Sequence, residues 1–140
     1  MLFPKKVKFR KSHTFRRNPK RALNASRGLT VAFGSHGLKA VGHARVRSNQ
    51  IESARKVIAR NLGKGGKQWI RIFPDKPFTK KPPEVKLGKG KGDIEGYEVE
   101  VWPGRVLFEI DGVSDEVAVK ALSGAAQKLP LKTKVVARAH

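Results

Sequence analysis

The sequence predicts an α+β fold in which two helices pack on one largely antiparallel sheet. Several short stretches alternate apolar and polar residues and are separated by turns of hairpin length. Two longer stretches instead carry apolar residues three and four positions apart, which is the spacing of a helix face. The length of 140 residues fits one domain. The predicted order is strand, strand, helix, strand, long loop, strand, strand, helix and strand.

Two strands and a helix are expected first. Residues 29–33 and residues 38–46 are extended stretches, and glycines bound the turn at residues 34–37 between them. Ser48 is a favourable N-cap, and the apolar residues after it keep helical spacing until Gly63. These signals predict two strands followed directly by a helix.

A third strand and a long loop come next. Residues 68–73 alternate in side-chain direction as a strand does, and the turn at Pro74–Pro77 ends this strand. Residues 78–92 combine prolines, lysines and spaced glycines, which do not belong inside a helix. We expect these residues to form a long basic loop on the folded domain.

The second half of the chain repeats the pattern. Residues 97–102 and residues 105–110 form two predicted strands, joined by the Pro103–Gly104 turn. Ser114 caps the second predicted helix, which has acidic residues in its first turn and ends before Pro130. A last alternating stretch, residues 131–137, predicts the final strand.

The formal net charge of +20 is concentrated in the N-terminal part of the chain. Residues 1–51 carry 13 Lys and Arg and no acidic residue, residues 52–93 have a net charge of +8, and residues 94–140 have a net charge of −1. Such localisation is typical of a surface that binds a polyanion, either nucleic acid or an acidic membrane. We predict a basic N-terminal arm at residues 1–28 and a single α+β RNA-binding domain at residues 29–140.

Two interpretations of the arm are open. Ten basic residues accompany six residues of the Leu, Ile, Val and Phe class in this segment, as in a disordered cationic tail. Phe3, Phe9 and Phe15 recur among the cations, and aromatic rings of this kind stack on bases or pack locally. This recurrence favours an arm that becomes ordered on RNA.

The glycine-rich part of the predicted loop has the composition of a phosphate-binding segment. Glycines at positions 88, 90 and 92 separate Lys89 from Lys91, so the backbone can approach a phosphate chain closely. The alternative is a flexible hairpin tip with solvated lysines. Further lysines in the same stretch favour a loop that enters an RNA crevice, although DNA is chemically compatible as well.

Several function classes are excluded by what the sequence lacks. No apolar run approaches the roughly 18 residues of a membrane span, and no signal-peptide pattern opens the chain, so we expect no membrane partner. With no cysteines and four unpaired histidines, the chain has no ligand set for a metal. Two glycine clusters, at residues 63–67 and 88–92, do not match a P-loop. We therefore expect no catalytic residues, no metal, no cofactor and no enzyme activity.

Seven motifs, in order along nearly the whole chain, match one known family. They are residues 1–11, 33–38, 50–55, 69–77, 80–82, 88–92 and 128–133. With these motifs the chain resembles the bacterial large-subunit ribosomal protein L-sixteen family, within the universal uL-sixteen family. One departure is Lys86, which stands where the family often has an arginine that some bacteria hydroxylate.

The resemblance implies a fold of the α/β-hammerhead type and a structural role in the large ribosomal subunit of the cytoplasmic ribosome. It implies binding to large-subunit rRNA near the central protuberance and contact with neighbouring ribosomal proteins. It also implies that the loop contacts A-site and P-site tRNA, supporting assembly and tRNA positioning at the peptidyl-transferase centre.

The predicted site consists of lysines and arginines in two groups. The RNA-binding group is Lys5, Lys6, Lys8, Arg10, Lys11, Arg16, Arg17, Lys39, Arg45, Arg55, Lys56, Arg60, Arg71 and Lys76. The tRNA-proximal loop group is Lys80, Lys81, Lys86, Lys89 and Lys91. The rival interpretation is a general nucleic-acid chaperone or nucleoid-type binder, which binds duplex DNA and unrelated RNA as tightly as rRNA.

Overall fold

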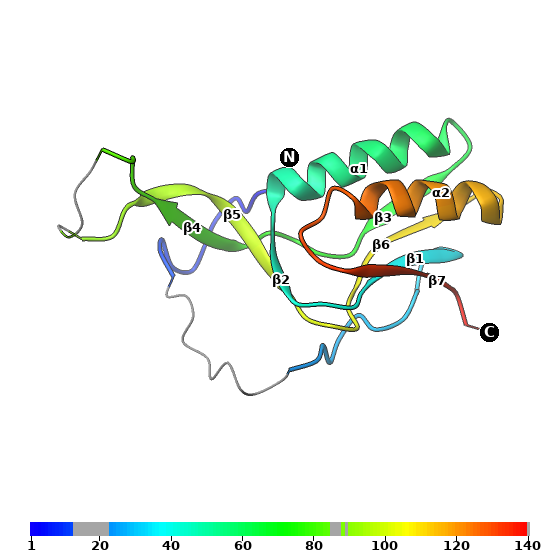
Figure 1. Ribbon diagram of the computed structural model, residues 1–140, viewed down its shortest axis with the longest axis horizontal. Coiled ribbons are helices and arrows are strands. Elements are labelled where there is room, and N and C mark those ends of the chain that lie inside the picture. The colour runs from blue at the N-terminus through cyan, green and yellow to red at the C-terminus, as the bar shows by residue number, and fades with distance from the viewer. Residues whose placement is uncertain (13–22, 85–87, 89, 140) are drawn as a thin grey trace.

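The computed structural model describes residues 1–12, 23–84, 88 and 90–139, and Figure 1 shows the arrangement of their helices and strands. The elements are β1 (His36–Ala40), β2 (Ala44–Arg47), α1 (Ser48–Leu62), β3 (Lys67–Ile70), β4 (Lys76–Lys80), β5 (Asp93–Val101), β6 (Val106–Asp111), α2 (Asp115–Ala126) and β7 (Thr133–Ala137). The predicted α+β class and the two helices are confirmed.

The strands form two sheets rather than the single sheet that was expected. One sheet has the order β3-β6-β1-β7 and the other has the order β2-β5-β4. All the pairs in both sheets are antiparallel, as predicted. The two helices lie side by side over one face of the four-stranded sheet, and the β4–β5 hairpin extends away from this body (Figure 1).

The core lies between the two helices and the four-stranded sheet. The buried side chains of α1 are Ile51, Ala54, Ile58 and Leu62, and those of α2 are Ala118, Ala121, Leu122 and Ala125. They pack with Leu38, Phe108 and Ile110 of the sheet. Each large apolar side chain that is fully buried contributes about 1.5–3 kcal/mol relative to exposure. The helical spacing in the sequence therefore identified the core faces of both helices.

The expected strand over residues 29–33 is absent, and β1 begins at His36 inside the expected turn. The backbone N–H groups of Ala32 and Phe33 donate to the Glu109 carboxylate at 2.7 and 2.8 Å, and Gly34 does so at 3.1 Å. A chain that wraps around one carboxylate cannot also form a strand ladder. The residue types of this segment favour a strand, and they therefore led to a wrong prediction here.

The expected continuous strand over residues 38–46 is also wrong, because β1 and β2 belong to different sheets. Between them, the N–H groups of Val41 and Gly42 donate to the Lys132 carbonyl at 2.8 and 3.2 Å. This carbonyl comes from a distant part of the chain and turns the backbone out of the first sheet. Apolar and polar residues alternate on both sides of this bend without interruption. The alternation therefore predicted one continuous strand.

The expected loop at residues 78–92 is shorter than predicted, because β4 occupies its beginning and the expected turn before it. Pro77 lies within β4, which is possible because β4 is an edge strand and a proline there need not donate to a neighbour. β5 begins at Asp93, four residues before the expected strand. The result is a long hairpin whose tip, residues 81–92, joins the two strands.

Both helices lie where they were predicted, but the prediction that Ser48 is the N-cap of the first helix is wrong. α1 begins at Ser48, and the preceding Arg47 is its N-cap, with the Arg47 N–H donating to Gln50 Oε1 at 2.9 Å. Gly63 ends α1 with a φ of 65°, a conformation that favours glycine. α2 follows Ser114 as expected and ends at Ala126, before the predicted end.

Candidate nucleic-acid interface

The arm and the tip of the β4–β5 hairpin contact each other through lysines. Lys11 Nζ donates to the Lys91 carbonyl at 3.1 Å, and Lys91 Nζ donates to the Ser12 carbonyl. Lys81 Nζ donates to the carbonyl of Gly88 within the tip. Carbonyl oxygens carry no net charge, and among the described residues these three lysines form no ion pair with a carboxylate. The structure thereby brings together the two basic segments that the sequence predicted separately.

Glycine is required in the tip for two different reasons. Gly88 and Gly90 have φ values of 99° and 89°, which other residues rarely adopt. A Cβ at Gly92 would lie 2.9 Å from the Lys80 carbonyl oxygen, because the two chains of the hairpin approach closely there. The tip therefore exposes backbone with few side chains between its lysines.

The first helix presents two exposed cations and one paired cation. Lys56 and Arg60 are exposed on its outer face. Arg55 instead binds Glu52 through two hydrogen bonds, of which the one from Nε measures 3.0 Å. This hydrogen bond lowers the pKa of Glu52 and raises the pKa of Arg55. The charge of Arg55 is thus compensated within the helix.

Two more predicted RNA-binding arginines form ion pairs inside the fold. Arg45 lies 3.8 Å from the buried carboxylate of Glu98, between strands β2 and β5. Arg71 pairs with Glu109, whose side chain is fully buried. Burial acts to raise the pKa of Glu109, but hydrogen bonds from Arg71 and from three backbone N–H groups outweigh it and lower this pKa.

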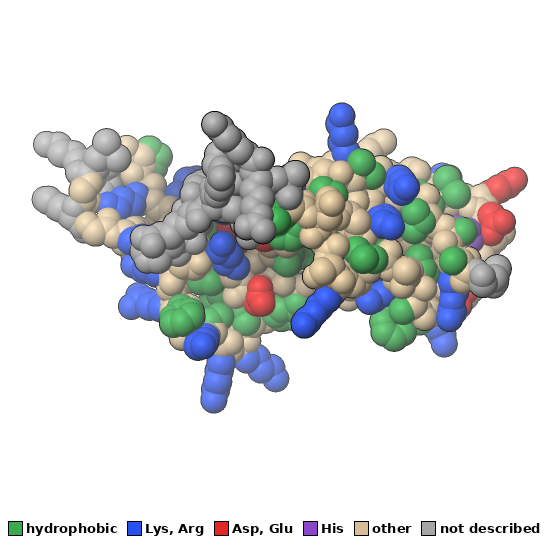
Figure 2. All heavy atoms as spheres, turned by 90° about the horizontal axis from the view of Figure 1, so that it is seen from below, with side chains coloured by type: hydrophobic (Ala, Val, Ile, Leu, Met, Phe, Trp, Pro, Cys, Tyr) green, Lys and Arg blue, Asp and Glu red, His purple; other side chains and the backbone are tan. Residues whose placement is uncertain are grey.

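The remaining predicted residues differ in exposure. Lys5, Lys6, Lys8, Arg10 and Lys80 are exposed, and Lys39 and Lys76 are half-buried on β1 and β4. Arg16, Arg17, Lys86 and Lys89, together with Phe15, lie outside the described residues. Figure 2 shows Lys and Arg side chains around the hairpin end and a group of Asp and Glu side chains at the opposite end of the molecule.

Two arginines on this surface were missed by the sequence analysis. The guanidinium of Arg47 lies 4.5 Å from the ring centre of Phe78, and this contact links β2 to β4 of the hairpin. Arg105 donates to the carbonyls of Arg27 and Arg71 at 3.2 and 2.7 Å. Arg47 lies two positions after Arg45 in the same strand, so the spacing that led to Arg45 could also have identified Arg47. Arg105 is the first residue of a predicted strand, and nothing in the sequence around it indicates a binding role.

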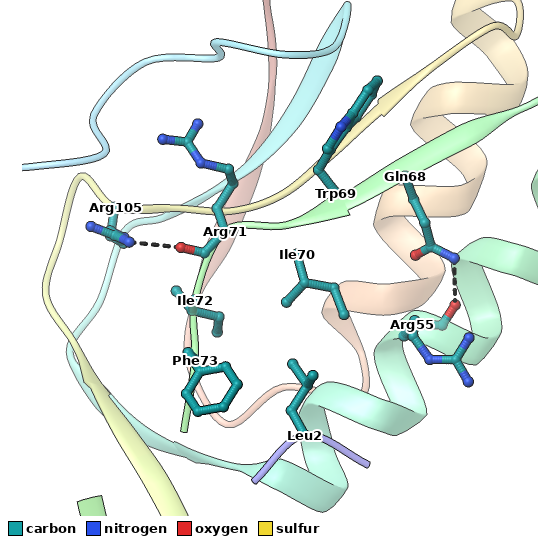
Figure 3. Close-up of a pocket in the computed structure, with 9 residues that line it drawn as sticks. All are labelled: Leu2, Arg55, Gln68, Trp69, Ile70, Arg71, Ile72, Phe73 and Arg105. Carbon is teal, nitrogen blue, oxygen red and sulfur yellow. Dashed lines mark hydrogen bonds between the residues drawn. The ribbon is translucent and has the colours of Figure 1, made fainter. Parts of the chain in front are cut away.

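Two hollows lie on either side of Arg105. The first has a volume of about 660 Å³ and is shown in Figure 3. Its lining residues are Leu2, Arg55, Gln68, Trp69, Ile70, Arg71, Ile72, Phe73 and Arg105. The second has a volume of about 400 Å³, and it shares Ile72, Phe73 and Arg105 with the first.

No group of three or more potential metal ligands occurs in the part of the chain that the structure describes. The helices in that part are also too short or too polar to cross a membrane.

Comparisons with known proteins give matches along nearly the whole chain. The family model described as "Ribosomal protein L16p/L10e" matches residues 4–136. Proteins named "Large ribosomal subunit protein uL16" are similar to this chain in several bacteria. The protein of Fervidobacterium nodosum is 54% identical over 140 residues, covering 100% of this chain and 96% of the relative. The protein of Thermosipho melanesiensis is 55% identical over 138 residues, covering 99% and 94%. The protein of Psychrobacter arcticus is 51% identical over 138 residues, covering 99% and 98%.

Proposed function

The chain belongs to the ribosomal protein L16p/L10e family, and from this premise we propose that it binds large-subunit rRNA near the central protuberance. As a member of this family it is a structural, non-enzymatic protein of the large subunit of the cytoplasmic ribosome, with rRNA and other ribosomal proteins as its partners. It contacts A-site and P-site tRNA, and it supports subunit assembly and tRNA positioning at the peptidyl-transferase centre.

The single observation that carries this proposal is the contact between the arm and the hairpin tip. Lys11, Lys81 and Lys91 direct their ammonium groups to carbonyl oxygens, and Lys80 is exposed beside them. No carboxylate of the described part of the chain forms an ion pair with these lysines, and such a cluster of like charges is unfavourable in the free protein. An RNA backbone that enters the cluster removes this repulsion and releases its own counterions.

The shape of the hairpin supports a role in a crevice of folded RNA. β4 and β5 extend from the body of the molecule, and the glycines at the tip leave its backbone accessible (Figure 1). Protein groups that enter RNA in this way bind phosphates and 2′-hydroxyls and recognise shape rather than base sequence. Compensated arginines such as Arg45 instead stabilise the platform that carries the hairpin.

Filter binding to a large-subunit rRNA fragment tests the rRNA contact. The double variant Lys80→Ala, Lys91→Ala should bind more weakly, and the slope of log affinity against log salt should fall by about two. The matched control is Lys120→Ala, Lys128→Ala, which removes the same charge from one exposed position in α2 and one exposed position just after it. A control variant that loses as much slope would show that only total charge matters, and the proposal would be wrong.

The nucleic-acid chaperone hypothesis makes a different prediction for specificity. At matched salt, duplex DNA and unrelated RNA should compete poorly with the rRNA fragment if the folded RNA is recognised by shape. Equal competition by all three would favour the general binder.

The tRNA contact is tested in reconstituted large subunits. Subunits that contain the Lys80→Ala, Lys91→Ala variant should assemble but should bind A-site tRNA more weakly than subunits with the control variant. Unchanged tRNA binding in assembled subunits would remove the tRNA part of the proposal and leave the rRNA part standing.

A further inference from the structure

Arg105 carries a charge that the described protein does not compensate. Its guanidinium donates to two carbonyl oxygens, those of Arg27 and Arg71, and forms no ion pair with a carboxylate of the described residues. Burial first, and then the neighbouring charge of Arg71, lower the pKa of Arg105. A bound anion would relieve both effects. Arg105 therefore differs from Arg45, Arg55 and Arg71, which all have carboxylate partners.

Arg105 is the one arginine of the first hollow that has no carboxylate partner among the described residues, since Arg55 pairs with Glu52 and Arg71 pairs with Glu109. Three arginines line this hollow and no carboxylate does. In Figure 3, Arg105 lies on one side of the hollow and Arg55 lies on the other, with Ile70 and Ile72 between them. The hollow follows the outer edge of β3, which pairs only with β6 among the described strands. Backbone N–H and C=O groups at such an edge are available to a ligand.

The second hollow has a different chemistry and lies directly beyond Phe73. Asp75, Glu100 and Trp102 line it in addition to the shared residues. Glu100 also bonds His43 at 3.1 Å, and the ring of His43 stacks on Trp102, so Asp75 is the acidic residue with no such contact to His43. Carboxylates repel a phosphate but accept hydrogen bonds from the amino groups of bases. Phe73 is 45% exposed and belongs to both hollows, so its ring stands at their boundary together with Arg105.

We propose that the two hollows hold two consecutive unpaired nucleotides of large-subunit rRNA, with the linking phosphate on the Arg105 guanidinium and the bases on either side of Phe73. This inference rests on the proposed rRNA-binding function and specifies one contact within it. Planar guanidinium groups bind phosphate oxygens through two parallel hydrogen bonds. Splayed bases of single-stranded RNA stack on aromatic side chains.

A protein segment fits the same surface less well. A peptide strand added to the β3 edge would satisfy the backbone groups, but it would bring no regular anion to Arg105. One small molecule would fill one hollow and leave the other empty. A dinucleotide unit has one phosphate between two bases. The surface has one cation, Arg105, between two hollows, so the two arrangements are complementary.

Two variants separate the phosphate from the bases in filter binding to the rRNA fragment. Phe73→Ala should weaken binding about tenfold, because one stacked base is lost, and should leave the salt slope unchanged. Arg105→Gln should weaken binding and lower the slope by about one. Phe73→Trp should restore the affinity lost in Phe73→Ala. The matched control is Val119→Ala, which removes an apolar side chain of α2 that is 45% exposed, as Phe73 is, and that lines neither hollow.

Photocrosslinking identifies the occupant directly. Assembled large subunits with 4-thiouridine in their rRNA should give crosslinks at Phe73, Trp102 or Trp69, and these crosslinks should disappear in Phe73→Ala subunits. Crosslinks at these residues to tRNA alone, or chemical crosslinks to another ribosomal protein alone, would overturn the inference. If Arg105→Gln does not fold, Phe73→Ala with its control and the crosslinks decide the question.

Failure of this inference is distinguishable from failure of the proposed function. A wild-type chain that does not bind the rRNA fragment would contradict the proposed function itself. Normal wild-type binding, with Phe73→Ala equal to wild type and no crosslinks in the hollows, would overturn only the two-nucleotide site.

Discussion

Glu109 shows how one residue directs local structure. It lies in β6 with no exposed surface, and its Oε1 accepts the N–H groups of three consecutive residues in the segment before β1. Its other oxygen binds Arg71. A buried carboxylate is stable only when hydrogen bonds and an opposite charge replace its lost hydration. Glu109 therefore fixes a backbone segment that has no ladder of its own.

Replacing Glu109 by Gln should destabilise the protein by about 3 kcal/mol, because the Arg71 guanidinium loses its partner in a partly buried place. Urea unfolding followed by circular dichroism measures the change in free energy of unfolding. The matched control is Glu52→Gln, which removes the carboxylate of a more exposed pair on α1 and should cost less than about 1 kcal/mol. Equal losses in the two variants would contradict the role assigned to Glu109.

The lowered pKa of Glu109 gives its contribution a definite pH dependence. The unfolded chain binds a proton on this carboxyl near the ordinary value of 4.5, whereas the native protein does so only at lower pH. The stabilisation is therefore complete above about pH 5 and declines as the pH falls through the native pKa. In urea titrations, the difference between wild type and Glu109→Gln should shrink steadily below about pH 4.5. A difference that stays constant down to pH 3 would contradict the assignment.

Local sequence signals predicted some of these residues and not others. The glycines of the hairpin tip were identified because their spacing among lysines is visible in the sequence, and two of them have positive φ. The partnerships of Arg71 and Arg45 were not predicted, since each carboxylate partner is more than 35 residues away. Tertiary contacts decide whether a lysine or arginine is exposed and whether it forms an ion pair. A set of RNA-binding cations predicted from the sequence therefore includes some that are paired with carboxylates.

The helices were predicted well, because the spacing of their apolar residues is visible in the sequence. The strands whose limits depend on contacts with distant residues were not. α1 and α2 were located by apolar spacing and caps, which are local properties. β4 was missed because Pro77 argues against a strand unless the strand is known to lie at an edge. The division between β1 and β2 was missed because a carbonyl near the far end of the chain makes the bend.

The hairpin can be shortened without loss of the sheet. Replacing residues 81–92 by an Asn-Gly turn should leave β2, β4 and β5 paired, because all contacts between these strands lie outside the tip. The variant should unfold at nearly the wild-type urea concentration. The slope of log rRNA affinity against log salt should fall by about four, because four lysines are removed. A shortened protein that is unfolded, or one that keeps the full slope, would contradict the separation of platform and tip.

Positive charge is distributed unevenly over the molecule. Uncompensated lysines lie on the arm and the hairpin, whereas the segment from residue 94 onward, with both α2 and β7, is close to neutral. Self-repulsion within a chain of net charge +20 opposes the compact state. The same charges favour association with a polyanion.

These opposing effects predict opposite responses to salt. Raising the salt concentration from about 20 mM to about 200 mM shortens the screening length roughly threefold, so the melting temperature of the free protein should rise. Over the same range its affinity for the rRNA fragment should fall. Scanning calorimetry and filter binding in the same buffers check the pair of responses. A melting temperature that falls with salt would show that attractive ion pairs, rather than repulsion, dominate the free protein.

The position of β1 in its sheet has a consequence for the order of folding. β1 lies between β6 and β7, so both of its neighbours are more than 60 residues further along the chain. During synthesis, the basic N-terminal segment and β1 therefore emerge long before any strand is available to pair with them. Such non-local pairing is slow and leaves early segments exposed. The nascent chain must pass through a stage in which its most positive third is unfolded, and in which nucleic acid or a chaperone is its readiest partner.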